Sequence, residues 1–397
     1  MPKIDTMLLA LNRVKDTLDF DRAACVRTRN RHSSCSRCAE ACPIAAIVFA
    51  DDEVCIDAEA CLGCGICAAA CPTGALIALS PTDDELLEAC KAAAGKTDGE
   101  AIIADNALLE AASGLYDPEK VVGLPGIGRI SESLLLSLAA CPDITRVTVV
   151  CSAEGASPLS PADGRAEQAC LVARALLQVW HSPFEIRCAS KLPGKIRASQ
   201  AEAYDKSRRD FFSSLKDEAR NVAVIAAEQT AQDMGFPTEA APEPEPERLH
   251  VDKNGVLPQS FPPARKKLLD ALDAMGEPVP MRLNTSLWAQ VDIDMTKCSS
   301  CRMCATFCPT GALFRFRTRN GKVGVKQRPR QCVACGCCRD MCPEHAITLN
   351  PKVVSTDIAT GETQRFEMAL PDTHKGGQKS MMYSMRKILG TELVNDR

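Results

Sequence analysis

The middle of the 397-residue chain alternates short apolar runs with segments whose apolar positions recur at helical spacing. The helical segments are expected at residues 81–94, 106–113, 131–140 and 165–180. The apolar runs lie at residues 101–104, 120–124, 146–151 and 184–188. Runs of this length that alternate with helices are typical of a parallel sheet buried between helices. The pattern therefore predicts a small parallel α/β domain.

The pattern changes on both sides of that domain. Residues 196–248 become charged and helical and end in the acidic, proline-rich APEPEPE, which cannot build an apolar core. A further helix is expected at residues 264–275, and the polar sequence after residue 350 has weak structural signals. The predicted divisions are two cysteine-rich domains at 1–80 and 291–350, the α/β domain at 81–195, a helical and Pro/Glu-rich linker at 196–290, and an extended tail at 351–397.

Charge and composition narrow the classes of function. The formal net charge of −4, from 47 basic and 51 acidic residues, gives no electrostatic argument for a nucleic-acid partner. No window approaches the ~20 apolar residues of a membrane span, and the charged N-terminus is typical of an amphipathic helix rather than a signal peptide. A chain this long does not need disulfides to fold, so its 23 cysteines indicate metal binding in a reducing cytoplasm.

Most of the cysteines lie in four similar segments, two near each end of the chain. The segments begin at Ser33, Cys61, Cys298 and Cys332, and three of them contain a complete CxxCxxCxxxCP. Such a loop holds three thiolates against one [4Fe–4S] cube, and the cysteine before proline binds the second cube of a pair. Zinc fits less well, because a zinc site closes with four ligands and leaves the third closely spaced cysteine unexplained.

The two C-terminal motifs complete each other. The first C-terminal site is predicted to consist of Cys298, Cys301, Cys304 and Cys342. The second C-terminal site is predicted to consist of Cys308, Cys332, Cys335 and Cys338. Cys337, the additional cysteine of CGCC, is expected to be a bystander.

The N-terminal motifs leave one ligand open. The second N-terminal site is complete, with Cys42, Cys61, Cys64 and Cys67. The first N-terminal site has Cys35, Cys38 and Cys71, but His32 occupies the position three residues before Cys35. Cys25 is the favoured fourth ligand, with His32, Cys55, an exogenous ligand or a three-iron cluster as alternatives. Four [4Fe–4S] clusters are expected in all.

The segments CLGCGICAAACPTGA and CSSCRMCATFCPTGA resemble bacterial two-cluster ferredoxins. The resemblance implies a ferredoxin-like fold at each end of the chain, with hairpins and short helices around two cubes. The expected fold class is α+β, with two ferredoxin-like dicluster domains flanking the small parallel α/β domain and joined to it by helical and extended linkers.

The middle domain carries a weaker resemblance. Its segment LPGIGRISESLLLSLAACPDITRVTVVCSAEGA resembles the delta subunit of methanogen-type hydrogenases, in which a further cysteine pair follows a similar strand. Here the residues directly after Cys151, SAEGASPLS, contain no second cysteine. Four cysteines of this segment and the one after it are therefore expected to be structural: Cys141, Cys151, Cys170 and Cys188. Gly126 and Gly128 lie between a strand and a helix, where they could contact a phosphate of a flavin or nucleotide or could form a tight turn.

Two clusters of basic residues lie close to the cysteine motifs. Arg27, Arg29, Arg31 and Arg37 surround the incomplete motif, and residues 315–330 contain seven basic residues and no acidic one. Because each cube with four thiolates is an anion, these residues could offset its charge or could bind an acidic partner. Asn320 and Gly321 predict a hairpin turn within the second cluster.

The sequence favours a non-catalytic electron-transfer subunit that relays electrons between a redox donor or acceptor and a larger enzyme. The expected partner is a molybdenum or tungsten oxidoreductase, a hydrogenase or a flavoprotein. The alternative is a self-contained flavin-dependent oxidoreductase whose cofactor site lies in the α/β domain. The chain has five histidines and no paired nucleophile and base motif, so catalytic residues cannot be identified.

Overall fold

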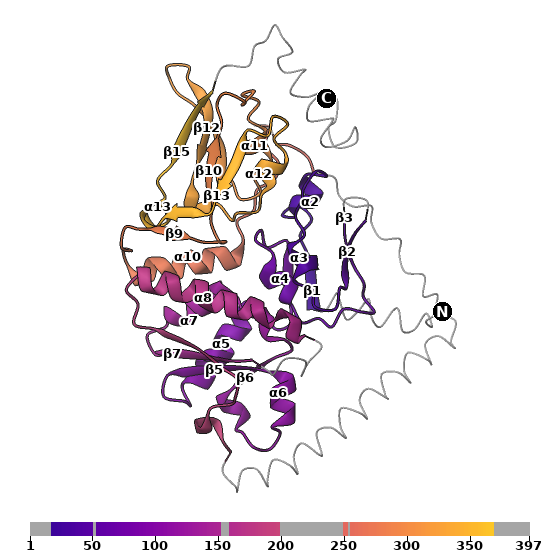
Figure 1. Cartoon of the computed structure of the whole chain (residues 1–397), viewed down its shortest axis with the longest axis vertical. Coiled ribbons are helices and arrows are strands. Elements are labelled where there is room, and N and C mark those ends of the chain that lie inside the picture. The colour runs from indigo at the N-terminus through magenta and orange to yellow at the C-terminus, as the bar shows by residue number, and fades with distance from the viewer. Residues whose placement is uncertain (1–16, 51–52, 152–158, 199–248, 253–254, 369–397) are drawn as a thin grey trace, which may run out of the picture.

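The computed structural model describes residues 17–50, 53–151, 159–198, 249–252 and 255–368. Within them, an N-terminal cysteine region (residues 17–80), a middle domain (81–198) and a C-terminal cysteine region (282–368) pack together (Figure 1). The helix predicted at the N-terminus and the APEPEPE linker lie outside the described residues. No helix in the described ranges has the length and apolar character needed to cross a bilayer.

The middle domain contains the predicted parallel sheet. Its strands are β5 (Glu100–Asp105), β6 (Val122–Leu124), β7 (Arg146–Val150) and β8 (Glu185–Ala189). Their order is β6-β5-β7-β8, and all three pairings are parallel. The helices are α5 (Asp83–Ala94), α6 (Asn106–Ala111), α7 (Glu132–Ala139) and α8 (Asp163–Val179). Short 3₁₀ turns are η1 (Pro118–Lys120), η2 (Ile127–Arg129), η3 (Ser160–Ala162) and η4 (Gly194–Ile196). The sequence prediction of a parallel α/β domain is confirmed.

Local sequence signals explain where these elements begin. Thr82 and Glu85 form a capping box at the start of α5, in which each side chain accepts the other residue's backbone N–H. The Ser131 hydroxyl accepts the N–H of Leu134 at 3.2 Å and begins α7. β5 is buried along its whole length, as expected for a central strand covered on both faces.

The N-terminal cysteine region consists of short hairpins and helices. Its strands are β1 (Leu18–Phe20), β2 (Ile47–Ala50), β3 (Glu53–Ile56) and β4 (Leu76–Ala78). They form two antiparallel pairs, β1 with β4 and β2 with β3. Its helices are α2 (Val26–Arg29), α3 (Arg37–Glu40) and α4 (Ile66–Ala70).

The C-terminal cysteine region is larger. Its strands are β9 (Arg282–Asn284), β10 (Gln290–Ile293), β11 (Leu313–Arg317), β12 (Val323–Gln327), β13 (Ile347–Asn350), β14 (Lys352–Val354) and β15 (Gln364–Met368). Its helical elements are α11 (Met303–Phe307), η5 (Pro329–Gln331), α12 (Cys337–Asp340) and α13 (Ser355–Thr360). The antiparallel sheets are β10-β13, β9-β14 and β11-β12-β15.

Two predicted boundaries differ from the structure. The segment after residue 350 does not begin as a tail, because β14 pairs with β9 and β15 completes the sheet with β12. The second part of the predicted linker is not a linker either: α10 (Pro263–Met275) packs against α7 and shares its apolar core. Trp288 is fully buried in the same core, and its indole N–H donates to the Arg330 carbonyl at 3.1 Å. The C-terminal region is therefore continuous with the core of the middle domain.

Candidate metal centres

The four cysteine motifs share one backbone turn. Each motif ends in a cysteine followed by proline, and the third residue after that cysteine has a positive φ, between 48° and 70°. These residues are Ala45, Gly74, Gly311 and His345. Each of them donates its backbone N–H to the carbonyl oxygen of that cysteine, at 3.1 to 3.5 Å. Alanine and histidine rarely adopt this conformation, and such backbone strain is concentrated at functional sites. The repeat recognised in the sequence is thus also a repeat of backbone geometry.

The loops before these turns differ in backbone conformation between the three complete motifs and the incomplete one. Each complete loop has two left-handed residues at matching positions, the pairs being Gly63 and Gly65, Ser300 and Arg302, and Ala334 and Gly336. In the incomplete loop, the matching residue Ser36 has a φ of −131°. The missing cysteine and the different backbone therefore occur at the same place.

The first N-terminal site is built around a small cavity lined by Cys25, Cys35, Cys38 and Cys71. Cys25 reaches it from the residue that precedes α2. His32 and Cys55 are exposed and do not line this cavity. Burial raises the pKa of Cys38 to about 12, and the charges of Cys71, Cys35 and Cys25 add to the rise. The structure thus places Cys25 beside the three motif cysteines, whereas His32 and Cys55 do not line their cavity.

The thiols of the second N-terminal site influence one another in the same way. Burial raises the pKa of Cys67 to about 12, with further contributions from Cys64, Cys61 and Cys42 among its neighbours. The backbone N–H of Ala46 donates to the Cys42 sulfur at 3.3 Å. All four predicted cysteines therefore lie close together.

Each C-terminal site lines a small cavity of its own. One is lined by Cys298, Cys301, Cys304 and Cys342. The other is lined by Cys308, Cys332, Cys335, Cys337 and Cys338. Backbone N–H groups donate to one sulfur of each site at 3.4 Å, from Leu313 to Cys308 and from Ala346 to Cys342. The Cys337 thiol donates instead to the carbonyl oxygen of Phe307 at 3.5 Å.

The chemistry of these donor sets fits iron–sulfur clusters. Burial raises the pKa of thiols in all four sites, including Cys25, Cys64, Cys298 and Cys335. Four buried thiols can be deprotonated together only if a positively charged metal group compensates them. Within the described ranges, no three His, Cys, Asp or Glu side chains converge closely enough to hold one metal ion. A cube needs no such convergence, because each cysteine binds a different iron.

The first N-terminal site and the second C-terminal site lie against each other. Val26 and Cys35 share an apolar cluster with Phe307, Cys337 and Cys335. Figure 1 shows α2 beside the C-terminal region that contains α11 and α12. The two sites therefore contact each other through one shared apolar cluster.

Hydrogen bonds fix this boundary. The backbone N–H and hydroxyl of Ser34 donate to Asp340 at 2.8 and 2.7 Å, and Arg37 donates to the Ala334 carbonyl at 2.8 Å. Burial acts to raise the pKa of Asp340, but the bonds from Ser34 and Arg339 hold it below its ordinary value. The sequence patterns marked Arg37 but gave no signal for Ser34 or Asp340, because their roles depend on a contact between distant segments.

The remaining predicted site residues lie in the middle domain. Cys170 is fully buried and Cys188 is exposed, and the thiol of Cys188 accepts a hydrogen bond from Arg174 at 3.3 Å. Gly126 directly precedes η2, and Gly128 is its middle residue. A Cβ at Gly128 would lie 2.7 Å from the Ala162 carbonyl oxygen, and one at Gly126 would lie 3.0 Å from the Leu159 side chain. These glycines allow close packing of η2 against η3, which occupies the space in front of them.

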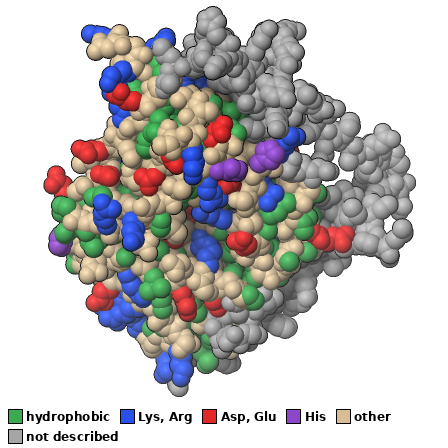
Figure 2. Space-filling model, turned by 45° about the horizontal axis from the view of Figure 1, so that its top comes forward, with side chains coloured by type: hydrophobic (Ala, Val, Ile, Leu, Met, Phe, Trp, Pro, Cys, Tyr) green, Lys and Arg blue, Asp and Glu red, His purple; other side chains and the backbone are tan. Residues whose placement is uncertain are grey.

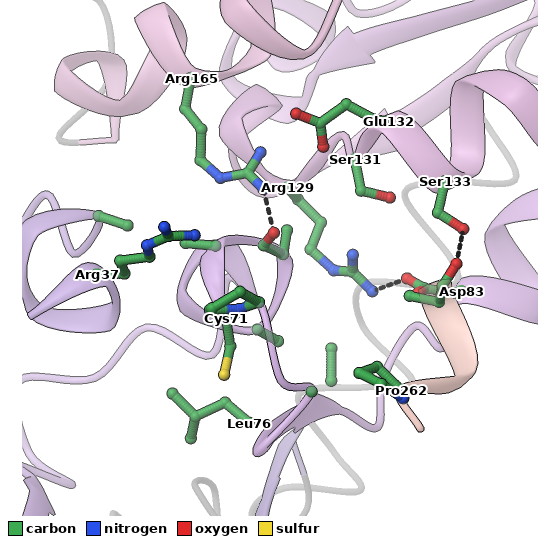
Figure 3. Close-up of a pocket in the computed structure, with 18 of the residues that line it drawn as sticks. Arg37, Cys71, Leu76, Asp83, Arg129, Ser131, Glu132, Ser133, Arg165 and Pro262 are labelled. Carbon is green, nitrogen blue, oxygen red and sulfur yellow. Dashed lines mark hydrogen bonds and ion pairs between the residues drawn. The ribbon is translucent and has the colours of Figure 1, made fainter. Parts of the chain in front are cut away.

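A cavity of about 830 Å³ lies where the three parts of the molecule meet. It is bordered by Cys42 and Cys71 of the N-terminal region and by the first turns of α5, α7 and α10. Figure 3 shows Arg129 in its wall, paired with Asp83 at 2.5 Å, and the Arg165 guanidinium donating to a backbone carbonyl. The cavity is large enough for a small organic cofactor.

The predicted basic hairpin is present as β11 and β12, with Gly321 at a φ of +78° in the turn. Several basic side chains on this sheet lie over aromatic rings, such as Arg328 over Phe314 at 4.2 Å. Figure 2 shows Lys and Arg side chains interspersed with Asp and Glu on one face of the molecule.

Comparisons with known proteins identify the two cysteine regions. Residues 33–75 match the family described as 4Fe-4S dicluster domain, and residues 291–314 match the 4Fe-4S binding domain. Searches of curated proteins and of solved structures gave no match. The chain is thus an iron–sulfur protein with a ferredoxin-type 4Fe-4S domain near each end and a parallel sheet between them.

Proposed function

We propose that this chain is an electron-transfer subunit in which four [4Fe–4S] clusters form one continuous relay. The first and second N-terminal sites and the first and second C-terminal sites would each hold one cluster, with Cys25 as the sixteenth ligand. Cys337 is left out of the ligand set, because its thiol donates to the Phe307 carbonyl and a neighbouring cysteine occupies each motif position.

The observation that carries the proposal is the packed contact between the first N-terminal and second C-terminal sites. Cys35 and Cys335 belong to one apolar cluster, and the charge of Cys25 reaches the Cys337 thiol. A direct packed contact between two cysteine-lined sites is the arrangement expected if electrons pass between the two regions. Two separate relays would require no such contact.

In the proposed relay, this contact lies between the two inner sites. The second N-terminal site lies at one end, followed by the first N-terminal, second C-terminal and first C-terminal sites. Apolar side chains are exposed beside both ends: Leu62, between Cys61 and Cys64, is 44% exposed, and Met295, shortly before Cys298, is 42% exposed. These ends are the proposed contact surfaces for a donor and an acceptor.

The proposed partner is a larger cytoplasmic redox enzyme, such as a molybdenum or tungsten oxidoreductase, a hydrogenase or a flavoprotein. The cysteine-lined sites favour this relay over independent catalysis, for which the sequence offers no paired nucleophile and base motif. The middle domain would then hold the two cluster-bearing regions in a fixed relative position, since its core continues into the C-terminal region.

The test is anaerobic purification of the full chain from its native host, with iron, sulfide and flavin counted on the same sample and copurifying proteins identified by mass spectrometry. The relay predicts about sixteen irons per chain, from four cubes, and a redox enzyme subunit in stoichiometric amount. A chain with well under that iron content, or one that reduces a substrate unaided, contradicts the proposal.

A second candidate function is favoured by one observation, the cavity of about 830 Å³ beside Cys42 and Cys71. A flavin bound there would lie next to both N-terminal sites and would make the chain a self-contained oxidoreductase. The same flavin count separates the two functions: stoichiometric flavin in the isolated chain supports the second, and its absence supports the relay.

A further inference from the structure

Arg29 is a buried cation beside the second C-terminal site. It is 1% exposed, and its Nε donates to the carbonyl of Phe307 at 3.1 Å, next to Cys308 in the sequence. Its Nη1 donates to the carbonyls of Ala23 and Pro258 at 2.7 and 2.6 Å. Its Nη2 is buried and has no hydrogen-bond partner among the described residues. One N–H group of a guanidinium is thus left for a group that binds at this boundary.

The groups that act most strongly on the charge of Arg29 are cysteines of the second C-terminal site. Burial lowers the pKa of Arg29, whereas Cys337, Cys308 and Cys335 act to raise it, ahead of Asp21. In the described structure Arg29 forms no ion pair with a carboxylate. Its electrostatic neighbours are therefore chiefly the cysteines of the second C-terminal site, with Asp21 as a weaker acidic neighbour.

Arg265 approaches the same site from the opposite part of the chain, on α10. It is 7% exposed, and its Nη2 donates to the Leu287 carbonyl at 2.8 Å while the guanidinium lies 4.9 Å from the Trp288 ring. Its Nη1 is also buried without a hydrogen-bond partner. Burial lowers the pKa of Arg265 to about 10, and Glu132 and Cys332 act against this. Two buried guanidinium groups, each with one unused N–H, thus flank one cysteine site.

Basic residues near the other sites are partly exposed or already paired with a carboxylate. Arg129, beside Gly65 of the second N-terminal site, is 4% exposed but forms an ion pair with Asp83. Arg27 donates to the Cys35 carbonyl at 2.6 Å but is only partly buried, and Arg22 is paired with Glu53. Arg302 and Arg315, beside the first C-terminal site, are also partly exposed to water. Water and counter-ions weaken the effect of exposed charges far more than that of buried ones.

Burial creates a problem that these arginines would solve. Reduction adds one negative charge to a cluster that is already an anion, and a buried environment opposes this addition. The second C-terminal site lies at the contact between the two regions, so burial would oppose reduction of its cluster if nothing compensated it. In an electron relay, such a cluster would be an uphill step in the middle of the path.

We propose that Arg29 and Arg265 raise the reduction potential of the cluster in the second C-terminal site. Electron transfer through the middle of the relay is then not an uphill step. This inference rests on the proposed function, because it requires a cluster at that site. The two arginines are positioning and charge-compensating residues: neither is a cluster ligand, and each acts through its fixed charge and its unused N–H.

The test is a redox titration of the full chain followed by electron paramagnetic resonance, on the wild type, Arg29→Gln, Arg29→Lys and Arg265→Gln. The glutamine variants should lower the midpoint potential of one cluster by at least about 59 mV, which for a one-electron couple corresponds to a tenfold change in the oxidised-to-reduced ratio. Arg29→Lys keeps the charge and should retain most of the wild-type potential. Arg317→Gln, which removes an exposed charge from the same region, is the matched control and should leave all potentials unchanged.

The outcomes separate the inference from the function on which it rests. Wild-type protein with fewer than four clusters overturns the proposed function. With four clusters present, unchanged potentials in Arg29→Gln and Arg265→Gln overturn the inference, as does an equal shift in Arg29→Lys, which would indicate a purely structural role. If Arg29→Gln fails to assemble, Arg265→Gln, which lies on α10 and outside the Ser34–Asp340 and Arg37–Ala334 hydrogen bonds, still decides the question.

Discussion

The middle domain buries a four-stranded sheet among four helices, whereas the strands around the cysteine sites are three to five residues long and mostly form two-stranded pairs. Most of the large apolar core belongs to the middle domain and to α10, which packs on it. The core around the N-terminal sites is small and consists partly of the motif cysteines themselves. The same chain thus contains one part that can fold through apolar burial and two parts that depend on what the cysteines bind.

The cysteines show the same difference. Cys90 is fully buried among apolar side chains of the middle domain, as free cysteine often is in a protein core, and burial alone raises its pKa. In the end regions, Cys38 and Cys67 have other motif thiols as neighbours, and burial together with the charges of those thiols raises the pKa of each to about 12. A buried cysteine is therefore informative about metal only when its neighbours are also cysteines.

Removal of iron should give the largest effect and test this difference directly. We expect anaerobic chelation to unfold the two cysteine regions, because cores this small rarely stabilise a fold without metal or disulfides. The parallel sheet of the middle domain should persist. Hydrogen exchange measures this: amides of β2 and β10 should lose protection while those of β5 and β7 keep it. Equal loss of protection in all four strands would contradict the comparison.

The next largest effect should come from Cys25→Ser, which tests whether the incomplete motif is completed from outside. Loss of this ligand should remove about four irons, or one if a three-iron cluster forms, and should leave the other three clusters intact. Cys55→Ser is the matched control, because Cys55 is exposed on β3 and does not line the cavity. Iron and sulfide analysis with electron paramagnetic resonance decides it, and wild-type iron content in Cys25→Ser would exclude Cys25 as a ligand.

The contrast also explains what the sequence could predict. The helices and strands of the middle domain were predicted within a few residues, because apolar periodicity is strong where a whole face is buried. For the cysteine sites, spacing predicted groups that the structure brings together. It favoured Cys25 over His32 as the fourth ligand but left His32 open, because that choice depends on how the chain before α2 folds back.

Other features have no local signal. β14 and β15 are short, and their partners β9 and β12 lie far away in the sequence, so a polar segment was expected to be a tail. Arg265 lies on a helix whose charged residues suggest a solvent-facing surface, yet tertiary packing makes it 7% exposed. Long-range pairing and the burial of charges are properties of the assembled molecule and not of any window of sequence.

A smaller effect is expected from Glu100→Gln, which disturbs the middle domain alone. The side chain of Glu100 is 7% exposed at the start of β5, accepts from Thr148, and is paired with Lys195 and Arg146. Burial acts to raise its pKa, but the Lys195 and Thr148 bonds and the two cations hold it below its ordinary value. Loss of the charge should cost about 1 to 3 kcal/mol of unfolding free energy at neutral pH, with cluster content unchanged.

The pH dependence checks the cause. Because the pKa of Glu100 is lower in the folded state, its contribution is complete above the ordinary glutamate pKa and disappears as the pH falls through the lowered folded value. Urea unfolding followed by circular dichroism should therefore show wild type and Glu100→Gln converging in acid. Glu185→Gln, which removes an exposed partner of Arg146, should have a smaller effect. A difference between wild type and Glu100→Gln that does not change with pH would point to packing rather than charge.

The smallest effect is expected from Cys337→Ser, and it tests the rule that neighbouring cysteines indicate metal. Cys337 is fully buried and lines the cavity of the second C-terminal site, so by position alone it looks like a ligand. Its thiol, however, donates to the Phe307 carbonyl, and a serine hydroxyl can make the same bond. Iron content and the resonance spectrum should therefore match wild type, with unfolding free energy within about 1 kcal/mol. Cys338→Ser, one residue away, should lose that cluster, and if both variants lost it, Cys337 would have to be counted among the ligands.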